Sequence, residues 1–363
     1  MARTRKIAGP VVGAEPILHW AARFEDRFHE LRERIARRRG YTPTIVPYTS
    51  YGGPGWVRIL CRVLLTRPSP DGRVHHRKIR GWRSFTSVPV NEAALTVRIG
   101  DTVHTLVADR GGVVDTVVTV DVEPGWHTIV ITTDDQRSTG QRDPEPDTVE
   151  APVFIVDPGA TVGLISDIDD TVMVTALPRP FLAAWNTFVL DEHARRPVPG
   201  MAVLYERLVR AHPGAPVFYL STGAWNVAPT LTRFLSRNLY PAGPLLLTDW
   251  GPTHDRWFRS GRQHKSESLH RLATEFPGIR WLLVGDDGQH DEEIYGQFSA
   301  EHETSVESVA IRQLSNSEAV LAGGRSKAEL HSGSGVRWVY APDGAGLADQ
   351  LLDETGPAVP KPL

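Results

Sequence analysis

Cysteine is nearly absent from this sequence of 363 residues, since Cys61 is its single thiol. One thiol excludes an internal disulfide framework, so the fold must be held by a packed core. Long apolar runs are missing too, and none approaches the roughly 20 residues that a membrane-spanning helix needs. The first residues also lack the apolar stretch of a secretory signal. We therefore expect a cytoplasmic protein that touches membranes only peripherally.

An excess of charge of either sign is missing as well. The 40 basic and 43 acidic residues give a formal net charge of −3, which creates no global field that would favour nucleic acid as a partner. Hydrophobic residues make up 40% of the chain, an ordinary share for a protein with a large core. Because 363 residues exceed the usual size of one core, we expect two domains.

Residues 1–40 carry an amphipathic helix in this interpretation. Between positions 14 and 39, apolar residues recur at three- and four-residue steps; they are Ile17, Trp20, Ala21, Phe24, Phe28, Leu31 and Ile35. The other face is rich in arginine, as in helices that lie on anionic membranes. Acidic residues interrupt that face, and arginine is favourable at the carboxyl end of any helix. We favour a helix docked on the neighbouring domain, with a membrane-surface helix as the alternative.

From residue 41 to 133 the apolar period changes to two, as in strands. The alternating sets are Val57, Ile59, Cys61 and Val63; Leu95, Val97 and Ile99; Val118 and Val120; and Trp126, Thr128, Val130 and Thr132. Turns that contain glycine and proline separate these runs. The pattern predicts an antiparallel β-sandwich of seven or eight strands. A linker and lead-in should follow at residues 134–155.

Residues 156–355 alternate between short apolar runs and helical periods, and residues 356–363 form a C-terminal tail. Strands are expected near 161–166, 216–221, 244–248, 280–285, 305–311 and 337–340. Helices are expected near 200–212, 226–237, 265–276, 291–298 and 346–353. This alternation predicts an α/β domain with a doubly wound parallel sheet, whose functional site lies at the carboxyl ends of the strands.

Three carboxylates end the first of these strands. Asp167, Asp169 and Asp170 follow an apolar run, and like charges so close together repel. A divalent cation with a phosphoryl group above it would offset this repulsion, which predicts a binding site at the strand end. The simpler alternative is an Asp-rich turn. Asp-x-Asp-x-Thr after a hydrophobic strand resembles the first motif of the haloacid dehalogenase-like phosphatases. The resemblance implies that Asp167 is the nucleophile, that Asp169 is the general acid/base, and that Thr171 contacts substrate.

The second and third motifs of that superfamily have counterparts here. The run 216–222 ends in hydroxyls, and the resemblance implies that Ser221, with Thr222 and Gly223, binds phosphate. The alternative for these hydroxyls is an N-cap for the next helix. Lys265 stands where we expect a helix to begin, a position that disfavours cations because of the helix dipole. We expect it to offset the charge of nucleophile and phosphate; a solvated surface lysine is the alternative.

The fourth motif is an apolar strand that ends in Gly-Asp-Asp and continues to Asp291. Gly-Asp-x-x-x-x-Asp resembles the metal-binding motif of the superfamily. The resemblance implies that Asp286 ligates a cation with Asp167 and the backbone carbonyl of Asp169, while Asp291 ligates it or holds Lys265. Hard oxygen ligands suit Mg²⁺ better than Zn²⁺.

Longer strings narrow the resemblance. Residues 166–172 (SDIDDTV), 218–226 (FYLSTGAWN) and 285–295 (GDDGQHDEEIY) are similar to the actin-patch-associated phosphatidate phosphatase family. That similarity implies Mg²⁺-dependent removal of phosphate from phosphatidate, or a related lipid phosphate, through an aspartyl-phosphate. Trp225-Asn226 departs from the proline-containing turn of the fungal pattern.

An insert at residues 172–199 follows the nucleophile and is expected to form a flap that leaves the entrance open to a bulky substrate. Its apolar side chains, Phe181 and Trp185 among them, would line the entrance for a lipid, with Trp225 at the rim. Arg262 is one of the arginines that could bind the headgroup phosphate. The alternative is that they pack on the sheet. Two other functions stay open: a phosphatase for a soluble sugar, nucleotide or protein phosphate, and a non-catalytic membrane- or protein-binding module.

Overall fold

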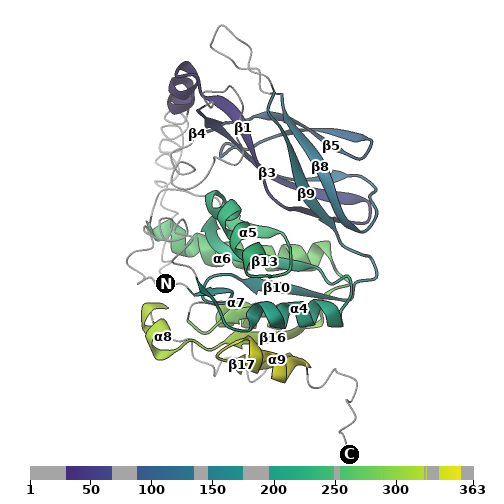
Figure 1. The fold of residues 1–363 in the computed structure, drawn as a ribbon, viewed down its shortest axis with the longest axis vertical. Coiled ribbons are helices and arrows are strands. Elements are labelled where there is room, and N and C mark those ends of the chain that lie inside the picture. Colours follow the sequence, from purple (N-terminus) through teal and green to yellow (C-terminus); the bar gives the residue numbers. More distant parts are fainter. Residues whose placement is uncertain are drawn as a thin grey trace, which may run out of the picture.

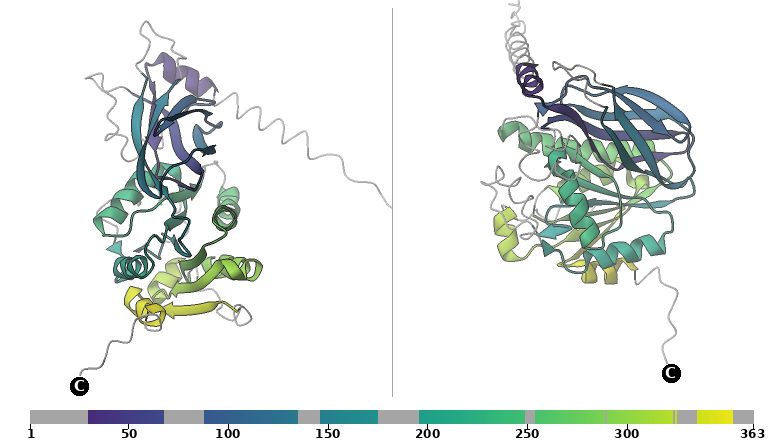
Figure 2. Two further views of the ribbon diagram at one scale, coloured as in Figure 1. Left: turned by 90° about the vertical axis from the view of Figure 1, so that its right-hand side faces the viewer. Right: turned by 45° about the horizontal axis from the view of Figure 1, so that its top comes forward.

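The computed structural model describes residues 30–67, 88–134, 146–174, 196–248, 254–288, 290–322, 324 and 335–352. A β-rich part stands above a layered α/β part in Figure 1, and Figure 2 shows the same two parts from other sides. Within the described ranges no helix combines the length and the apolar character needed to cross a bilayer.

The first part, which is called the sandwich below, is a nine-stranded sheet. Its strands are β1 (Thr42–Pro47), β2 (Ser50–Gly53), β3 (Trp56–Thr66), β4 (Val88–Pro89), β5 (Ala94–Ile99), β6 (Thr102–Val107), β7 (Val113–Thr119), β8 (Gly125–Thr133) and β9 (Thr148–Ile155). Their order is β1-β3-β2-β9-β8-β5-β6, and β4 and β7 pair with the other edge of β3. Every pair is antiparallel except β2–β9. Buried residues from both halves of the sheet, such as Ile59 and Ile129, share one core.

Three predictions about this part are wrong. It has nine strands rather than the seven or eight expected. Residues Thr148–Ile155, expected in the linker, form β9, because Val149 and Val153 face the core in a period of two that Glu150 and Pro152 obscure in the sequence. The alternating set in β8 was assigned to the wrong face. Trp126 is exposed, whereas Ile129 and Ile131, which point to the opposite face, are buried. A shift of one residue along a strand moves every side chain to the other face of the sheet.

The first helix is described only from residue 30 to 38, and positions 14–29 of the predicted helix lie outside the described residues. The backbone N–H of Asn91 donates to Glu33 at 3.3 Å, and Glu33 also pairs with Arg37. This end of the helix is therefore docked on the sandwich. Leu31 and Ile35, which belong to the predicted apolar face, are exposed.

The second part is a six-stranded sheet in the order β14-β13-β10-β15-β16-β17, with every pair parallel. Its strands are β10 (Val162–Asp167), β13 (Val217–Ala224), β14 (Leu245–Thr248), β15 (Arg280–Asp286), β16 (Val306–Arg312) and β17 (Arg337–Ala341). The chain leaves β10 toward β13 and β14, then returns to the other side for β15. The carboxyl end of β10 therefore lies at a topological switch point, where α/β sheets bind ligands.

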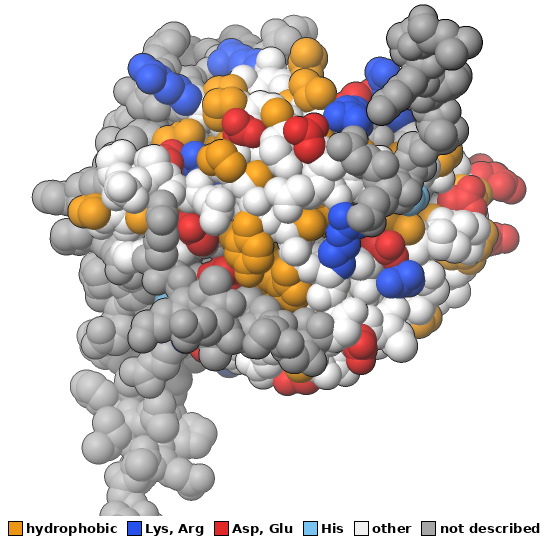
Figure 3. Space-filling view, turned by 90° about the horizontal axis from the view of Figure 1, so that it is seen from below, with side chains coloured by type: hydrophobic (Ala, Val, Ile, Leu, Met, Phe, Trp, Pro, Cys, Tyr) orange, Lys and Arg blue, Asp and Glu red, His pale blue; other side chains and the backbone are white. Residues whose placement is uncertain are grey.

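Helices cover both faces of this sheet, which confirms the α/β prediction. They are α4 (Met201–Ala211), α5 (Ala228–Arg237), α6 (His254–Glu275), α7 (Asp291–Glu301), α8 (Asn316–Ala322) and α9 (Gly344–Leu352), with the short 3₁₀ helices η3 (Trp225–Val227) and η4 (Glu303–Ser305). Helix α4 packs against α9, and α6 packs against α7. The face seen from below in Figure 3 intersperses acidic, basic and hydrophobic side chains, as the small net charge leads one to expect.

The ends of the 172–199 insert meet beside β10. Strand β11 (Met173–Val174) pairs antiparallel with β12 (Arg196–Pro197), so the insert begins and ends as a two-stranded ribbon. Met173 is fully buried. Phe181 and Trp185 lie outside the described residues.

Candidate active site

Charged side chains converge where three neighbouring strands end. Asp167 ends β10, Ser221 lies near the end of β13, and Asp286 ends β15. Parallel pairing in register places these ends along one edge, with Asp167 opposite Leu220 of β13. Asp167, Asp286 and Asp291 are each 1% exposed or less. Carboxylates are almost never buried this deeply without a partner.

Lys265 is that partner for two of them. Its Nζ lies 2.6 Å from Asp167 Oδ1 and 2.6 Å from Asp291 Oδ1. Burial alone would lower the pKa of Lys265, but the two carboxylates outweigh it and raise the pKa above its ordinary value. Lys265 is therefore a permanent buried cation between the first and fourth motifs, which rules out the alternative of a solvated surface lysine.

The helix-start argument for Lys265 is wrong. Helix α6 begins at His254, and Lys265 lies in its interior. The helix dipole acts only within the first and last turns. Its two ion pairs, rather than the helix end, hold this cation in place.

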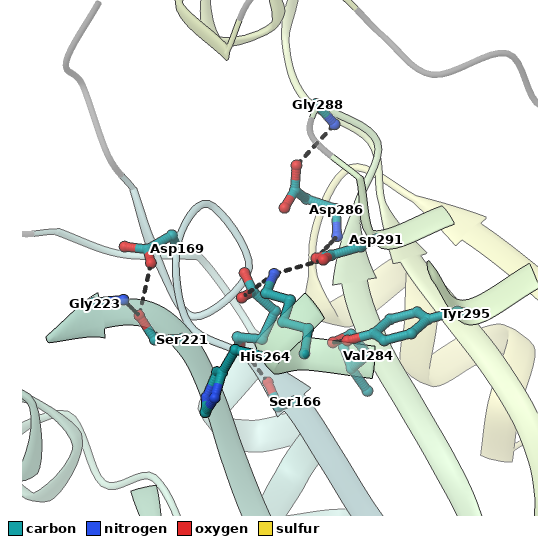
Figure 4. Close-up of polar contacts among 12 residues, drawn as sticks. Ser166, Asp169, Ser221, Gly223, His264, Val284, Asp286, Gly288, Asp291 and Tyr295 are labelled. Atoms are coloured by element: carbon teal, nitrogen blue, oxygen red, sulfur yellow. Dashed lines mark hydrogen bonds and ion pairs between the residues drawn. The ribbon is translucent and has the colours of Figure 1, made fainter. Parts of the chain in front are cut away.

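The turn after β15 shapes the acidic side of the site. The backbone N–H of Gly288 donates to Asp286 Oδ1 at 2.7 Å, and the N–H of Asp286 lies 3.4 Å from Asp291 Oδ2 (Figure 4). A Cβ on Gly285 would lie 2.7 Å from Asp291 Oδ2 and 2.8 Å from the ring of Tyr295. Glycine at position 285 is thus what allows Asp291 to approach the strand end.

Asp287 has a different role from its neighbour. Its Oδ1 accepts the backbone N–H of Leu314 at 2.8 Å, so it ties this turn to the segment after β16. Carboxylate oxygens of Asp167, Asp286 and Asp291 lie within 4.8 Å of one another, and all three residues are buried. The group that could hold a cation therefore includes Asp286.

On the opposite side, Ser221 orients Asp169. Ser221 Oγ donates to Asp169 Oδ2 at 3.0 Å and accepts the N–H of Gly223 at 3.0 Å, as Figure 4 shows. The hydroxyl of Thr248 donates to the carbonyls of Thr222 and Gly223. Helix α5 begins at Ala228 with no side-chain cap. The N-cap alternative for Ser221 and Thr222 is therefore wrong.

Several buried oxygens of the motif residues have no hydrogen-bond donor among the described residues. Asp167 Oδ2, Asp286 Oδ2 and Thr171 Oγ1 have no hydrogen-bond partner among the described residues. Burial raises the pKa of Asp167 well above its ordinary value; Lys265 opposes this, and Asp291 and Asp169 add to it. Burial likewise raises the pKa of Asp286, with Asp291 and Asp167 adding. Crowded, desolvated carboxylates of this kind form a set that a bound cation would stabilise.

The sequence motifs do not include Arg312, which supports the turn that follows Asp167. Asp170 adopts a left-handed backbone (φ 57°), and its carbonyl accepts Arg312 Nη1 at 2.6 Å. Arg312 is 5% exposed and also pairs with Glu318. Arginine at the end of an apolar run such as β16 is ordinary, so no local signal in the sequence identifies Arg312.

One expected rim residue lies elsewhere, and Arg262, expected to bind the headgroup phosphate, has an acidic partner. Trp225 is 5% exposed and stacks on Tyr48 of the sandwich, with ring centroids 4.4 Å apart. Arg262 pairs with Glu293. The prediction that Trp225 lines the entrance is wrong, because the sandwich covers that side chain.

A second cluster links the far ends of α6 and α7. His270 Nδ1 lies 2.9 Å from His302 Nε2, and His270 Nε2 lies 3.4 Å from Glu301. One ligand atom from each of the three residues lies within 4.8 Å of the others, but Glu301 is exposed and both histidines are only partly buried. We assign this half-exposed cluster to helix packing and the buried carboxylates to chemistry.

Comparison with known proteins agrees with this geometry. Residues 162–313 match the family model described as phosphatidate phosphatase APP1, catalytic domain. Phosphatidate phosphatase APP1 of Saccharomyces cerevisiae is 28% identical over 159 residues, which cover 43% of this chain and 26% of that protein. An uncharacterised protein of Schizosaccharomyces pombe is 24% identical over 140 residues, which cover 38% of this chain and 23% of that protein. The chain thus matches about a quarter of the length of these relatives.

Among solved structures, a carbohydrate acetylesterase from Xanthomonas citri aligns over 78% of this chain and 73% of its own, with a TM-score of 0.28 and 9% identity. That likeness is too low to bear on fold or function. The match over residues 162–313 includes every strand end and helix that contributes a charged group to the site. Over these residues the chain is similar to the catalytic domain of phosphatidate phosphatase APP1.

Proposed function

We propose that this chain is a Mg²⁺-dependent phosphatase of the haloacid dehalogenase-like type that hydrolyses phosphatidate or a related lipid phosphate. One observation carries the proposal: the buried Lys265 Nζ lies 2.6 Å from both Asp167 and Asp291, beside Asp286 at the next strand end. A nucleophilic carboxylate held by a fixed cation suits phosphoryl transfer, which depends mainly on positioning and charge stabilisation. The name of the yeast relative supports the lipid substrate.

The reaction would proceed in two steps through an aspartyl-phosphate. In the first, Asp167 Oδ2, which accepts no hydrogen bond from the described residues, attacks phosphorus, and the P–O bond to the alcohol breaks. Protonated Asp169 gives its proton to the leaving oxygen. In the second, Asp169 takes a proton from water as that water attacks the phosphorus, releasing phosphate and restoring Asp167. Ser221 keeps the Asp169 carboxyl oriented in both steps through its hydrogen bond to Oδ2.

The donor set fits Mg²⁺. Asp286 offers a buried carboxylate oxygen without a donor among the described residues, and Asp167 Oδ1 keeps a lone pair beside the one that faces Lys265. Hard oxygen ligands of this kind favour Mg²⁺. Both oxygens of Asp291 already contact Lys265 and the backbone of Asp286. We therefore propose that Asp167, Asp286 and the backbone carbonyl of Asp169 hold the ion, while Asp291 holds Lys265. Bound there, Mg²⁺ would offset the negative charge of the phosphate.

Phosphate release tests the proposal. Purified protein is assayed with phosphatidate in detergent micelles and with a water-soluble aryl phosphate, each with and without Mg²⁺. We expect Mg²⁺-dependent release from both, with phosphatidate preferred. Preference for the aryl phosphate would assign a soluble substrate. Release from neither, by protein with intact folding, would leave only a binding role and overturn the proposal.

A further inference from the structure

The two parts of the chain share one core. Tyr48, Tyr51 and Leu60 of the sandwich belong to the same buried cluster as Phe218 and Phe276 of the α/β part. The ring of Tyr51 stands edge-on to Phe218, with centroids 5.0 Å apart and planes at 89°. Tyr51 is fully buried, so the sandwich is not loosely attached.

One set of contacts reaches the turn that follows Ser221. Strand β13 carries Ser221 and runs directly into η3, which opens with Trp225 and Asn226. Tyr48 stacks on Trp225 with planes 25° apart, and Arg62 Nη1 donates to Asn226 Oδ1 at 2.8 Å. The sandwich thus holds both of the first two residues that follow β13.

Arg62 is itself held in place. Its Nε donates to the carbonyl of Gly111 at 3.0 Å. Asp109 Oδ1 accepts the N–H groups of Gly111 and Val113, each at 2.8 Å, and fixes that turn. A guanidinium bonded at both Nε and Nη1 loses much of its freedom. Polar contacts and a short stretch of backbone therefore link the sandwich turn to Asn226, from there to Ser221, and finally to Asp169.

A second set of contacts holds the helix that carries Lys265. Glu275, at the end of α6, accepts Tyr51 Oη at 2.9 Å and Arg58 Nε at 2.9 Å. Asp115 of β7 pairs with Arg271 of α6 at 2.8 Å and with Arg58 at 2.5 Å. The segments that carry Ser221 and Lys265 are therefore both anchored on the sandwich.

We infer that the sandwich is part of the catalytic apparatus, and that Arg62 and Tyr48 are positioning residues for Ser221 and Asp169. The kinetic side of this inference rests on the proposed function; the structural side does not. Misplacement of a catalytic group by about 1 Å can cost about 100-fold in rate. Loss of the Arg62–Asn226 contact should therefore lower kcat far more than it changes KM or stability.

A double-mutant cycle on the full chain tests this. Arg62→Ala and Asn226→Ala are each expected to lower kcat on the aryl phosphate about ten-fold, and the double variant should lose no more than either, because both remove one contact. Arg62→Lys keeps a donor near Asn226 and should recover part of the rate. Arg98→Ala, an exposed arginine on β5, is the matched control and should leave kcat unchanged.

Hydrogen exchange gives a readout that is independent of activity. In Arg62→Ala we expect faster exchange in residues 217–227 and unchanged exchange in β5 and β8, with a melting temperature within a few degrees of the wild type. Unchanged kcat together with unchanged exchange would overturn the inference. So would a rate loss accompanied by faster exchange throughout both parts, which is general destabilisation. If the wild type hydrolyses nothing, the proposed function fails, and the exchange experiment still decides this inference.

Discussion

At the scale of single residues, the site depends on one cation shared by two buried acids. Lys265 contacts Asp167 and Asp291 at equal distances, which fixes the nucleophile and keeps one of its oxygens free of other donors. Removing one partner of a buried ion pair typically costs about 3–5 kcal/mol, because the remaining charge is left uncompensated. Because Lys265 has two acidic partners, a substitution that neutralises only one of them leaves the cation paired with the other.

Asp167→Asn is such a substitution. It removes the nucleophile, retains the volume and relieves repulsion from Asp169, so we expect turnover below about 1% of wild type with a melting temperature near that of wild type. Aryl phosphate hydrolysis and thermal denaturation measure both. Asp349→Asn, at an exposed position of α9, serves as the control. Higher activity, with deamidation excluded by mass spectrometry, would refute the assigned nucleophile.

Alanine variants at positions 286 and 287 should distinguish a metal ligand from a residue that stabilises the fold. Asp286→Ala removes a ligand with a donor-free oxygen, and we expect weaker Mg²⁺ binding and lower activity together. Asp287→Ala removes the acceptor for the N–H of Leu314, so the loss should appear as about 1–3 kcal/mol of stability. Calorimetric Mg²⁺ titration and denaturant unfolding tell the two apart. A greater loss of Mg²⁺ affinity in the Asp287 variant would show that the ligand is Asp287.

Residue-level prediction succeeds where the signal is local. Asp167, Asp169 and Asp286 could be found because charges at the end of an apolar run are costly unless they serve a site. Arg312 and Arg62 could not be found this way. Their partners, Asp170 and Asn226, lie far away in the sequence, and an arginine in or after a strand is unremarkable until the fold brings its partner close.

At the scale of elements, α6 shows what the sequence pattern leaves out. The helical period is clear only from residue 265, yet the helix begins at His254. Tertiary contacts usually contribute more to helix stability than local propensity does. The buried Gly261 lies against Thr222 of β13, and this contact is invisible in the sequence. By contrast, the strands of the parallel sheet were predicted within a few residues, because strands buried on both faces read as continuous apolar runs.

Gly261 provides a test of this packing. A Cβ at this position would lie 3.0 Å from Cγ2 of Thr222. Alanine should gain about 1 kcal/mol of helix propensity but lose about 1–3 kcal/mol to overpacking. We therefore expect Gly261→Ala to lower kcat because the added methyl group displaces Thr222 of β13, next to Ser221. Thr222→Ser removes that methyl group while keeping the hydroxyl, so the double variant should recover activity.

Gly278→Ala is the control for Gly261→Ala, since a Cβ there meets nothing within 4 Å. Steady-state kinetics on the aryl phosphate distinguish the variants. If Gly261→Ala behaved like Gly278→Ala, the close approach of α6 to β13 would not matter for catalysis.

At the scale of the whole molecule, the shared core makes the two parts one cooperative unit. Tyr51 is fully buried between them and donates to Glu275. We expect a single thermal transition in the wild type. Tyr51→Phe should cost about 1.5–3 kcal/mol, the usual contribution of a hydrogen bond to a charged group. Tyr51→Ala should cost about 3–5 kcal/mol through the cavity it leaves. Calorimetry would contradict this view if the wild type unfolded in two separate transitions.

Domain organisation was predictable only in outline. The sequence separates the two folds, because the apolar period of two in residues 41–133 gives way to alternating short apolar runs and helical periods. Nothing local in the sequence shows that aromatic rings of the sandwich complete the core of the α/β part. Strand β9 was taken for a linker for the same reason, because Glu150 and Pro152 interrupt its apolar residues and its inward residues find partners only in the assembled sheet. The expected cytoplasmic location and peripheral membrane contact stay predictions.

The position of β9 also bears on how the chain folds as it is synthesised. Domains generally fold as units, with the N-terminal one first during translation. The sandwich closes its sheet once Ile155 has left the ribosome, because β9 joins β2 to β8. At that moment none of the six parallel strands has left the ribosome. The apolar face around Tyr51 is therefore not yet covered by Phe218 and Phe276. That face is a ready template for the second part, and until those residues arrive it is the surface that a chaperone would need to shield.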